Sequence, residues 1–262
     1  MNSKRLRLRL EALYRDYNRR EFVSPDPLQF LYEYPRAEDR EIAALFASSL
    51  AYGRVSMILR NLKRLFEPMG ASPRQFVEQS GEADWKELYA SFRHRFTDGG
   101  DVAALLAGVK SVTGQYGTLG GALNRFRAES GSLIGALDLL IAALSQGRKN
   151  SLLCRPSDGS ACKRHFLMLR WMTRCDDVDP GGWSCLSPSE LLVPLDTHMY
   201  HISAALGLTA RKSAGLKTAA EITAAFVEIC PEDPVRYDFA LTRFGIREEL
   251  TEQQLVDQLK RS

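Results

Sequence analysis

The residues best suited to chemistry gather between positions 162 and 208, where three of the four histidines of the chain also lie. Asp196 stands directly before a helix-like segment, Thr-His-Met-Tyr-His-Ile. An Asp in this place can cap a helix, because its carboxylate accepts hydrogen bonds from backbone N–H groups at the positive end of the helix dipole. Such a cap is worth about 1 kcal/mol. The same charge could instead stabilise a cation that develops on a substrate, and the residue type leaves both roles open.

Lys163 is the second candidate for chemistry. It opens the segment Lys-Arg-His-Phe-Leu-Met-Leu-Arg-Trp-Met, 33 positions before Asp196. A lysine beside a cleft can lose its charge through desolvation and attack a sugar carbon as a free amine. A solvated lysine at the start of a helix is the alternative.

Basic and aromatic residues in or near this stretch are the predicted nucleic-acid contacts. Residues 163–174 carry four Lys or Arg and no acid, a pattern that suits phosphate binding or a solvated helix face. Aromatic side chains here could stack on a base turned out of a duplex or belong to the core. The predicted phosphate contacts are Arg54, Arg164, Arg170, Arg174, His198, His201, Arg211 and Lys212, and the predicted stacking residues are Trp171, Trp183 and Tyr200.

Two further segments have unusual charge patterns. Asp176, Asp177 and Asp179 put three carboxylates on a short Gly/Pro turn, in a region (175–195) without Lys or Arg. These charges would repel a DNA backbone docked at the turn. Residues 92–96 alternate aromatic and basic side chains, Phe-Arg-His-Arg-Phe. This run could grip a nucleic-acid strand or form a partly buried helix end.

No metal and no cofactor are predicted. Asp196, His198 and His201 could form a two-histidine, one-carboxylate face, but the spacing supplies no further ligand. The five cysteines contain no C-x-x-C pair, which argues against zinc and iron–sulfur sites. Their odd number is typical of reduced thiols in a cytoplasmic protein.

Composition sets broad limits on function. The chain has 262 residues, 45% hydrophobic and 26% charged, which is enough to bury a sizeable core. The net charge of +3 gives no global field that would favour nucleic acid. No run approaches the ~20 apolar residues of a membrane span. We therefore expect a cytoplasmic protein with no membrane partner, and the sequence leaves its oligomeric state open.

The elements that must position these residues are expected to be helices. Apolar residues recur at three- and four-residue steps through most of the chain, and no run alternates with a period of two. Capping boxes are read at Ser187 and Thr218. We predict an all-α fold that forms a single two-lobed domain over residues 1–262, with a lobe boundary in the polar loop 146–160.

The segment Val193-Pro-Leu-Asp196-Thr-His198, continuing to Gly207, resembles the V-D-T-H-(V/I)-x-R signature of the helix-hairpin-helix DNA glycosylases, the endonuclease III superfamily. In that family the Asp is catalytic, stabilising the oxocarbenium-like sugar as a damaged base leaves. The resemblance implies a two-lobed helical glycosylase-like fold, base excision and a double-stranded DNA partner. His201 stands where glycosylases usually carry Arg.

The hairpin departs from the family pattern L-P-G-(V/I)-G-x-K-T, whose Lys lies 18 positions before the Asp and is Val178 here. The C-terminal iron–sulfur cysteines of endonuclease III are also missing. The archaeal 8-oxoguanine glycosylase branch is a closer local match, since its hairpin is divergent and its catalytic Lys begins the preceding helix, as Lys163 does. The resemblance therefore implies Asp196 as catalytic carboxylate, with Lys163 as an optional nucleophile.

A second resemblance spans most of the chain. The motifs Asp-Pro-Leu-Gln-Phe at 26–30 and Ala-Tyr-Gly-Arg at 51–54 resemble an uncharacterised bacterial family known only as a domain of unknown function. It brings no established activity. The alternative to a glycosylase is therefore a non-catalytic helical module that uses the same scaffold to bind nucleic acid or another partner.

Overall fold

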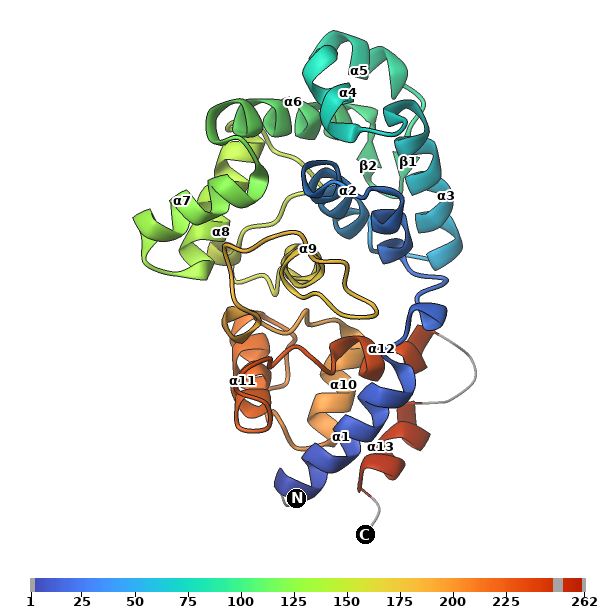
Figure 1. Cartoon of the computed structure of the whole chain (residues 1–262), viewed down its shortest axis with the longest axis vertical. Helices are drawn as coiled ribbons and strands as arrows, with labels where there is room; N and C mark the ends of the chain where they lie inside the picture. The colour runs from blue at the N-terminus through green and yellow to red at the C-terminus, as the bar shows by residue number, and fades with distance from the viewer. Residues whose placement is uncertain (1–2, 247–251, 261–262) are drawn as a thin grey trace.

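The computed structural model describes residues 3–246 and 252–260, and it confirms the all-α fold. The helices form two groups, one in the upper and one in the lower half of Figure 1, with α9 (Lys163–Thr173) between them. The upper group consists of α2 (Ala37–Ser49), α3 (Val55–Phe66), α4 (Pro73–Gln79), α5 (Glu82–Leu88), α6 (Gly99–Tyr116), α7 (Leu119–Ser130) and α8 (Leu133–Ser145). The lower group consists of α1 (Ser3–Tyr17), α10 (Thr197–Ala205), α11 (Leu216–Val227), α12 (Asp238–Ile246) and α13 (Glu252–Lys260).

Short elements connect these helices. Short 3-10 helices lie at η1 (Arg20–Phe22), η2 (Pro27–Glu33), η3 (Glu67–Met69), η4 (Pro156–Asp158) and η5 (Pro188–Glu190). A small antiparallel hairpin joins β1 (Arg93–His94) to β2 (Thr97–Asp98). The two ends of the chain meet in the lower group, because α1 packs against α12 and α13.

α2 is the central helix of the upper group. Its side chains from Glu41 to Ser49 are buried without interruption. A helix that is buried on all sides belongs in a core rather than on a surface. α2 packs against α9, so α9 is held from the upper side while its own polar residues reach the lower group.

Several local expectations need correction. For residues 92–96 the expected helix end is wrong, because residues 93–98 form the β1–β2 hairpin, while their contact with a nucleic-acid strand stays a prediction. Two-residue strands are too short to produce a period-two pattern, so they could not be predicted from the spacing of apolar residues. The capping box at Ser187 is confirmed, with Ser187 capping η5. The one at Thr218 is wrong, because α11 begins two residues earlier, at Leu216, after Gly215.

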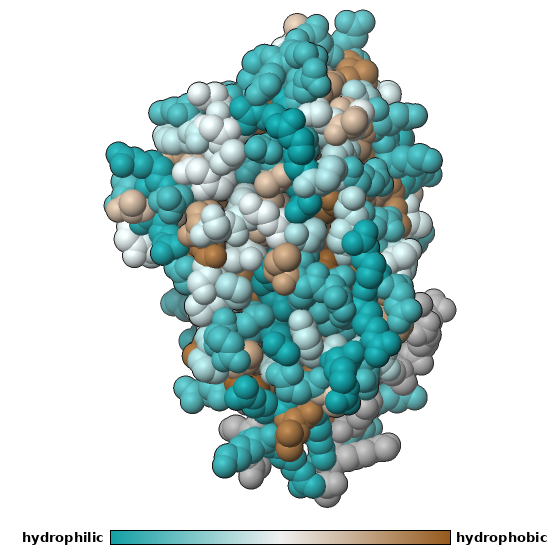
Figure 2. Space-filling view, viewed as in Figure 1, coloured by the Kyte–Doolittle hydropathy of each residue, from teal (hydrophilic) through white to brown (hydrophobic). Residues whose placement is uncertain are grey.

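The boundary predicted at 146–160 falls in the loop that leads from α8 to α9. This loop joins the upper group to the central helix, and the division into two lobes there remains a prediction. The described part of the chain contains no helix with the length and apolar content needed to cross a bilayer. The face seen in Figure 2 is mainly hydrophilic, and its hydrophobic residues are scattered rather than gathered into one patch.

Candidate functional site

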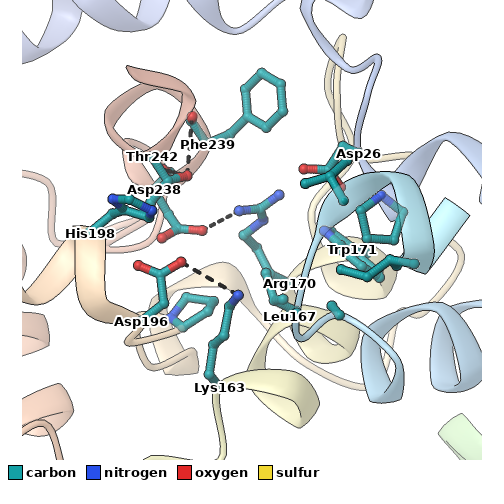
Figure 3. A pocket seen from close by; sticks show the side chains of 16 residues that line it. Asp26, Lys163, Leu167, Arg170, Trp171, Asp196, His198, Asp238, Phe239 and Thr242 are labelled. Atoms are coloured by element: carbon teal, nitrogen blue, oxygen red, sulfur yellow. Dashed lines mark hydrogen bonds and ion pairs between the residues drawn. The ribbon is translucent and has the colours of Figure 1, made fainter. Parts of the chain in front are cut away.

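A cavity of about 320 Å³ lies where α9, α10, α12 and residues 51–58 meet (Figure 3). Its size is within the range of ~300–1,000 Å³ that is usual for small-ligand pockets. Its walls combine charged and apolar side chains from elements far apart in the sequence. The lining includes Asp26, Gly53, Lys163, Leu167, Arg170, Trp171, Asp196, His198, Asp238, Phe239 and Thr242.

The two predicted catalytic residues lie in contact in the wall of this cavity. Lys163 Nζ lies 3.4 Å from Asp196 Oδ2, and the two side chains are 30% and 21% exposed. The other carboxylate oxygen, Asp196 Oδ1, accepts a hydrogen bond of 2.8 Å from the backbone N–H of Met199 and so caps α10. The cap and the cavity therefore use different oxygens of Asp196, and the two roles are compatible.

The place of Lys163 is not explained by helix stability. It is the first residue of α9, and Cys162 before it has φ 44° and makes no side-chain cap. A cation at a helix N-terminus is unfavourable, because the dipole is positive there. Asp196 offsets this charge from the start of α10, so the ion pair depends on the tertiary fold and not on α9 alone.

Asp238 is a third acid of the cavity that the sequence analysis missed. It begins α12, its side chain is 3% exposed, and one oxygen pairs with Arg170. Its other oxygen, Oδ1, is buried without a hydrogen-bond partner among the described residues. Burial, with a smaller contribution from the charge of Asp196, raises the pKa of Asp238 to about 6 against the opposing effect of Arg170. The sequence signal was an acid inside an apolar run, Tyr-Asp-Phe-Ala-Leu, which belongs to no motif.

This pKa leads to a prediction about stability. An ordinary Asp has a pKa of about 3.9, so the folded protein should bind a proton at Asp238 that the unfolded chain does not bind between about pH 4 and 6. The contribution of Asp238 to stability should therefore increase as the pH falls through 6, by at most roughly 3 kcal/mol relative to neutral pH.

The comparison is between the wild type and Asp238→Asn, which cannot titrate. Urea unfolding at pH 7.5 and pH 4.5 gives the free energy of unfolding of both proteins. The free energy of the wild type, relative to that of Asp238→Asn, should be higher at pH 4.5 than at pH 7.5. Other titrating groups are common to both proteins. A difference that does not change with pH would mean that the pKa of Asp238 is not raised.

The prediction that Arg170 and Arg174 contact DNA phosphates is wrong. Both side chains are buried, at 3% and 4% exposure. Arg170 lies between Asp238 and Asp179, 3.1 Å from an Asp179 oxygen. Arg174 pairs with Asp179 and lies 2.9 Å from Asp233. Their donors are used inside the protein, so neither can lie along a duplex.

The same network of buried ion pairs corrects the expectation for the acidic turn. Asp179 is fully buried and pairs with both arginines. Asp176 lies 2.8 Å from Arg174 and also accepts hydrogen bonds from the backbone N–H groups of Val178 and Asp179. Only Asp177 of the three acids is classed as exposed. The expected repulsion of phosphate by three carboxylates is therefore wrong, since two of them neutralise Arg170 and Arg174.

The three predicted stacking residues differ in their position relative to the cavity. Trp171 lines the cavity and is almost fully buried. Trp183 is wrong as a stacking residue, because its ring is buried and its indole N–H donates to Glu41 Oε2 at 2.8 Å. Tyr200 does not line the cavity, and its hydroxyl donates to the carbonyl of Arg211.

The remaining predicted phosphate contacts lie at different distances from the cavity. His198 lines it, whereas His201 is exposed outside the lining. Arg164 donates to the carbonyls of Ser49 and Ser151, at 2.9 and 3.1 Å. The other three are exposed: Arg54 follows the cavity residue Gly53, Arg211 pairs with Glu221 at 2.7 Å, and Lys212 follows it. Their contact with nucleic acid stays a prediction.

Metal ligation finds no support in the part of the chain that the structure describes. Within residues 3–246 and 252–260, no group of three His, Cys, Asp or Glu side chains is arranged to hold a metal ion. The two-histidine, one-carboxylate metal site considered for Asp196, His198 and His201 is therefore not formed among these residues.

An exposed aromatic side chain lies beside the cavity. Phe96, at the tip of the hairpin, is 67% exposed and stacks on Tyr52 with ring centroids 5.0 Å apart. The Arg164 guanidinium lies 5.3 Å from the Tyr52 ring, and the Arg95 side chain covers Gly53, which lines the cavity. We call Tyr52, Phe96, Arg54, Arg95 and Arg164 the hairpin patch.

The hairpin patch is held rigidly. The buried His94 contacts the carbonyl of Tyr52 through Nε2 and the side chain of Asn61 through Nδ1, both at 2.9 Å. The Tyr52 hydroxyl donates to the carbonyl of His94 at 3.0 Å. Phe96 is therefore presented to solvent on a fixed support next to the cavity.

Comparison with known proteins gives one match. A family model described as "Protein of unknown function (DUF2400)" matches residues 26–247. No curated protein and no solved structure matches the chain. The matched range contains both motifs that resembled a family of unknown function and every candidate site residue named above. Because the match covers most of its length, the chain belongs to the DUF2400 family.

Proposed function

We propose that this protein is a DNA glycosylase that excises a modified base, with Asp196 as catalytic carboxylate and Lys163 as nucleophile. The observation that carries the proposal is the approach of Lys163 Nζ to Asp196 Oδ2, 3.4 Å apart in a cavity that Trp171 also lines. A cavity of about 320 Å³ suits one extruded base rather than a duplex.

The proposed reaction uses the residues that line the cavity. The C1′–N bond of the damaged nucleotide breaks, and its electron pair leaves with the base. The negative charge of Asp196 stabilises the cation that develops on the sugar. The lone pair of Lys163 Nζ forms the new bond to C1′. Lys163 must first lose its proton, which the carboxylate of Asp238 in the same cavity can accept, so that Asp196 keeps its negative charge.

The proposed partner is double-stranded DNA, docked with the damaged nucleotide turned toward the cavity. The hairpin patch supports this orientation, because an exposed aromatic ring flanked by arginines suits a base that has lost its stacking partner. The loss of Arg170 and Arg174 as surface contacts leaves Arg54, Arg95 and Arg164 as the basic residues beside the cavity. The cytoplasmic location remains part of the proposal.

Phe96→Ala should weaken the binding of duplex DNA by about 10-fold, because stacking on one base is worth roughly 1–3 kcal/mol. Fluorescence anisotropy with a duplex that contains an abasic-site analogue measures the effect. Leu88→Ala is the matched control, since Leu88 is another exposed large hydrophobic residue, 47% exposed, on α5. Equal affinities for the two variants and the wild type would remove the hairpin patch from the DNA interface.

The direct test of function is single-turnover excision on a panel of duplexes, each carrying one damaged base. Borohydride should trap a covalent protein–DNA adduct with the wild type on the preferred duplex. Borohydride reduces the imine that the amine of Lys163 would form with the sugar. Lys163→Gln should therefore abolish the adduct, since an amide cannot form this imine. Absence of excision on every duplex would refute the proposal.

The second candidate is a non-catalytic binding module on the same scaffold. The observation in its favour is that Arg170 and Arg174 are neutralised internally, which removes two of the predicted DNA contacts. In that case Lys163 and Asp196 form only a structural ion pair. Duplex binding with a steep salt dependence but no excision would favour a nucleic-acid-binding module.

A further inference from the structure

Two cysteines meet at the start of α9. Cys162 precedes Lys163, and Cys154 lies in the loop that leads to it. The Cys162 thiol donates a hydrogen bond of 3.4 Å to the backbone carbonyl of Cys154. The pair is thus in contact although all five cysteines are free thiols.

The surroundings make the two thiols different. The neighbouring Cys162 side chain is the main cause that lowers the pKa of Cys154, with His165 and Arg164 contributing in the same direction against burial. The backbone N–H of Cys154 also donates to His165 Nε2 at 3.2 Å. The pKa of Cys162 is raised by its interaction with the Cys154 side chain and by burial. The two thiols are therefore not equivalent, and Cys154 is the one that loses its proton more readily.

The two cysteines also differ in their access to solvent. Cys154 lines an open hollow of about 560 Å³ together with Arg148, Lys149 and Arg155. Cys162 is 2% exposed. A small oxidant can reach Cys154 but not Cys162, while Cys162 is already placed to react with an oxidised Cys154. A partly exposed thiolate beside a second thiol is the arrangement of oxidation-sensitive cysteines.

We propose that Cys154 and Cys162 form an oxidation site that reacts with small hydroperoxides. The Cys154 thiolate attacks the outer peroxide oxygen, the O–O bond breaks, and the departing oxyanion takes up a proton to leave as water or alcohol. Cys154 is now a sulfenic acid. The Cys162 sulfur attacks the Cys154 sulfur and displaces hydroxide, which takes the proton of the Cys162 thiol and leaves as water. Two thiols are oxidised to one disulfide, and one hydroperoxide is reduced.

The site is independent of the proposed glycosylase activity, so its test reads the sulfur chemistry directly. The full-length protein is exposed to a small excess of hydrogen peroxide, the remaining thiols are blocked with N-ethylmaleimide, and peptides are mapped by mass spectrometry. The Cys154–Cys162 disulfide should form, disappear on reduction, and appear at least 10-fold faster than any oxidation of Cys175. Cys175 is the internal comparison, because it is exposed and is not the partner of another thiol in the described chain.

Cys162→Ser should stop the reaction at the sulfenic acid of Cys154, which dimedone then labels. Cys154→Ser should leave Cys162 reduced. Oxidation of Cys175 as fast as Cys154, or no disulfide between Cys154 and Cys162 in the wild type, would overturn the proposal. The wild-type measurement decides by itself if either variant fails to fold.

Discussion

Asp196→Asn is expected to leave the protein folded and to reduce base excision by on the order of 100-fold or more. The cap on α10 uses Asp196 Oδ1, and the amide oxygen of Asn can accept the same hydrogen bond from Met199. The other oxygen, which faces Lys163, loses its negative charge. Stability should therefore change by no more than about 1 kcal/mol, while the sugar cation loses its counter-charge.

Melting and single-turnover excision must be measured on the same preparations, with protein in excess of DNA. Asp98→Asn is a matched control, because Asp98 caps α6 through the backbone N–H of Asp101 and does not line the cavity. This control should keep the full excision rate. Full activity in a stable Asp196→Asn protein would leave Asp196 as a helix cap and would end its catalytic assignment.

The sequence predicted the helical fold and the helix cap because both depend on neighbouring residues. The three- and four-residue spacing of apolar side chains marks helices locally, and Asp196 caps the helix that follows it directly. The pairing of Lys163 with Asp196 is different, since 33 residues separate them. Only the resemblance to glycosylases pointed to it, and no spacing rule could have done so.

The errors concern charges whose partners are distant. An exposed arginine and a buried one look the same in a helix such as α9, and the sequence shows Arg170 beside no acid. Its partners are nine and 68 residues away, at Asp179 and Asp238. Asp238 was missed for the same reason. Burial turns these residues from surface charges into an internal network, and burial depends on the assembled fold.

Arg170→Met should lower the free energy of unfolding by about 3–5 kcal/mol, the usual result when one partner of a buried ion pair is removed. Met fills a similar volume but donates no hydrogen bonds. Asp238 would keep a buried carboxylate without its guanidinium, and Asp179 would retain only Arg174 of its two arginines.

Urea unfolding at pH 7.5 measures the loss. Arg211→Met is the control, since Arg211 pairs with Glu221 at the surface and should be replaceable with little change. The double variant Arg170→Met, Asp238→Asn should recover part of the loss, because the substitution removes the buried charge that the single variant leaves unpaired. Equal stability of Arg170→Met and the wild type would show that Arg170 contributes no net stabilisation. The role of the buried ion pairs would then be to hold the carboxylate of Asp238 in the cavity with Lys163 and Asp196.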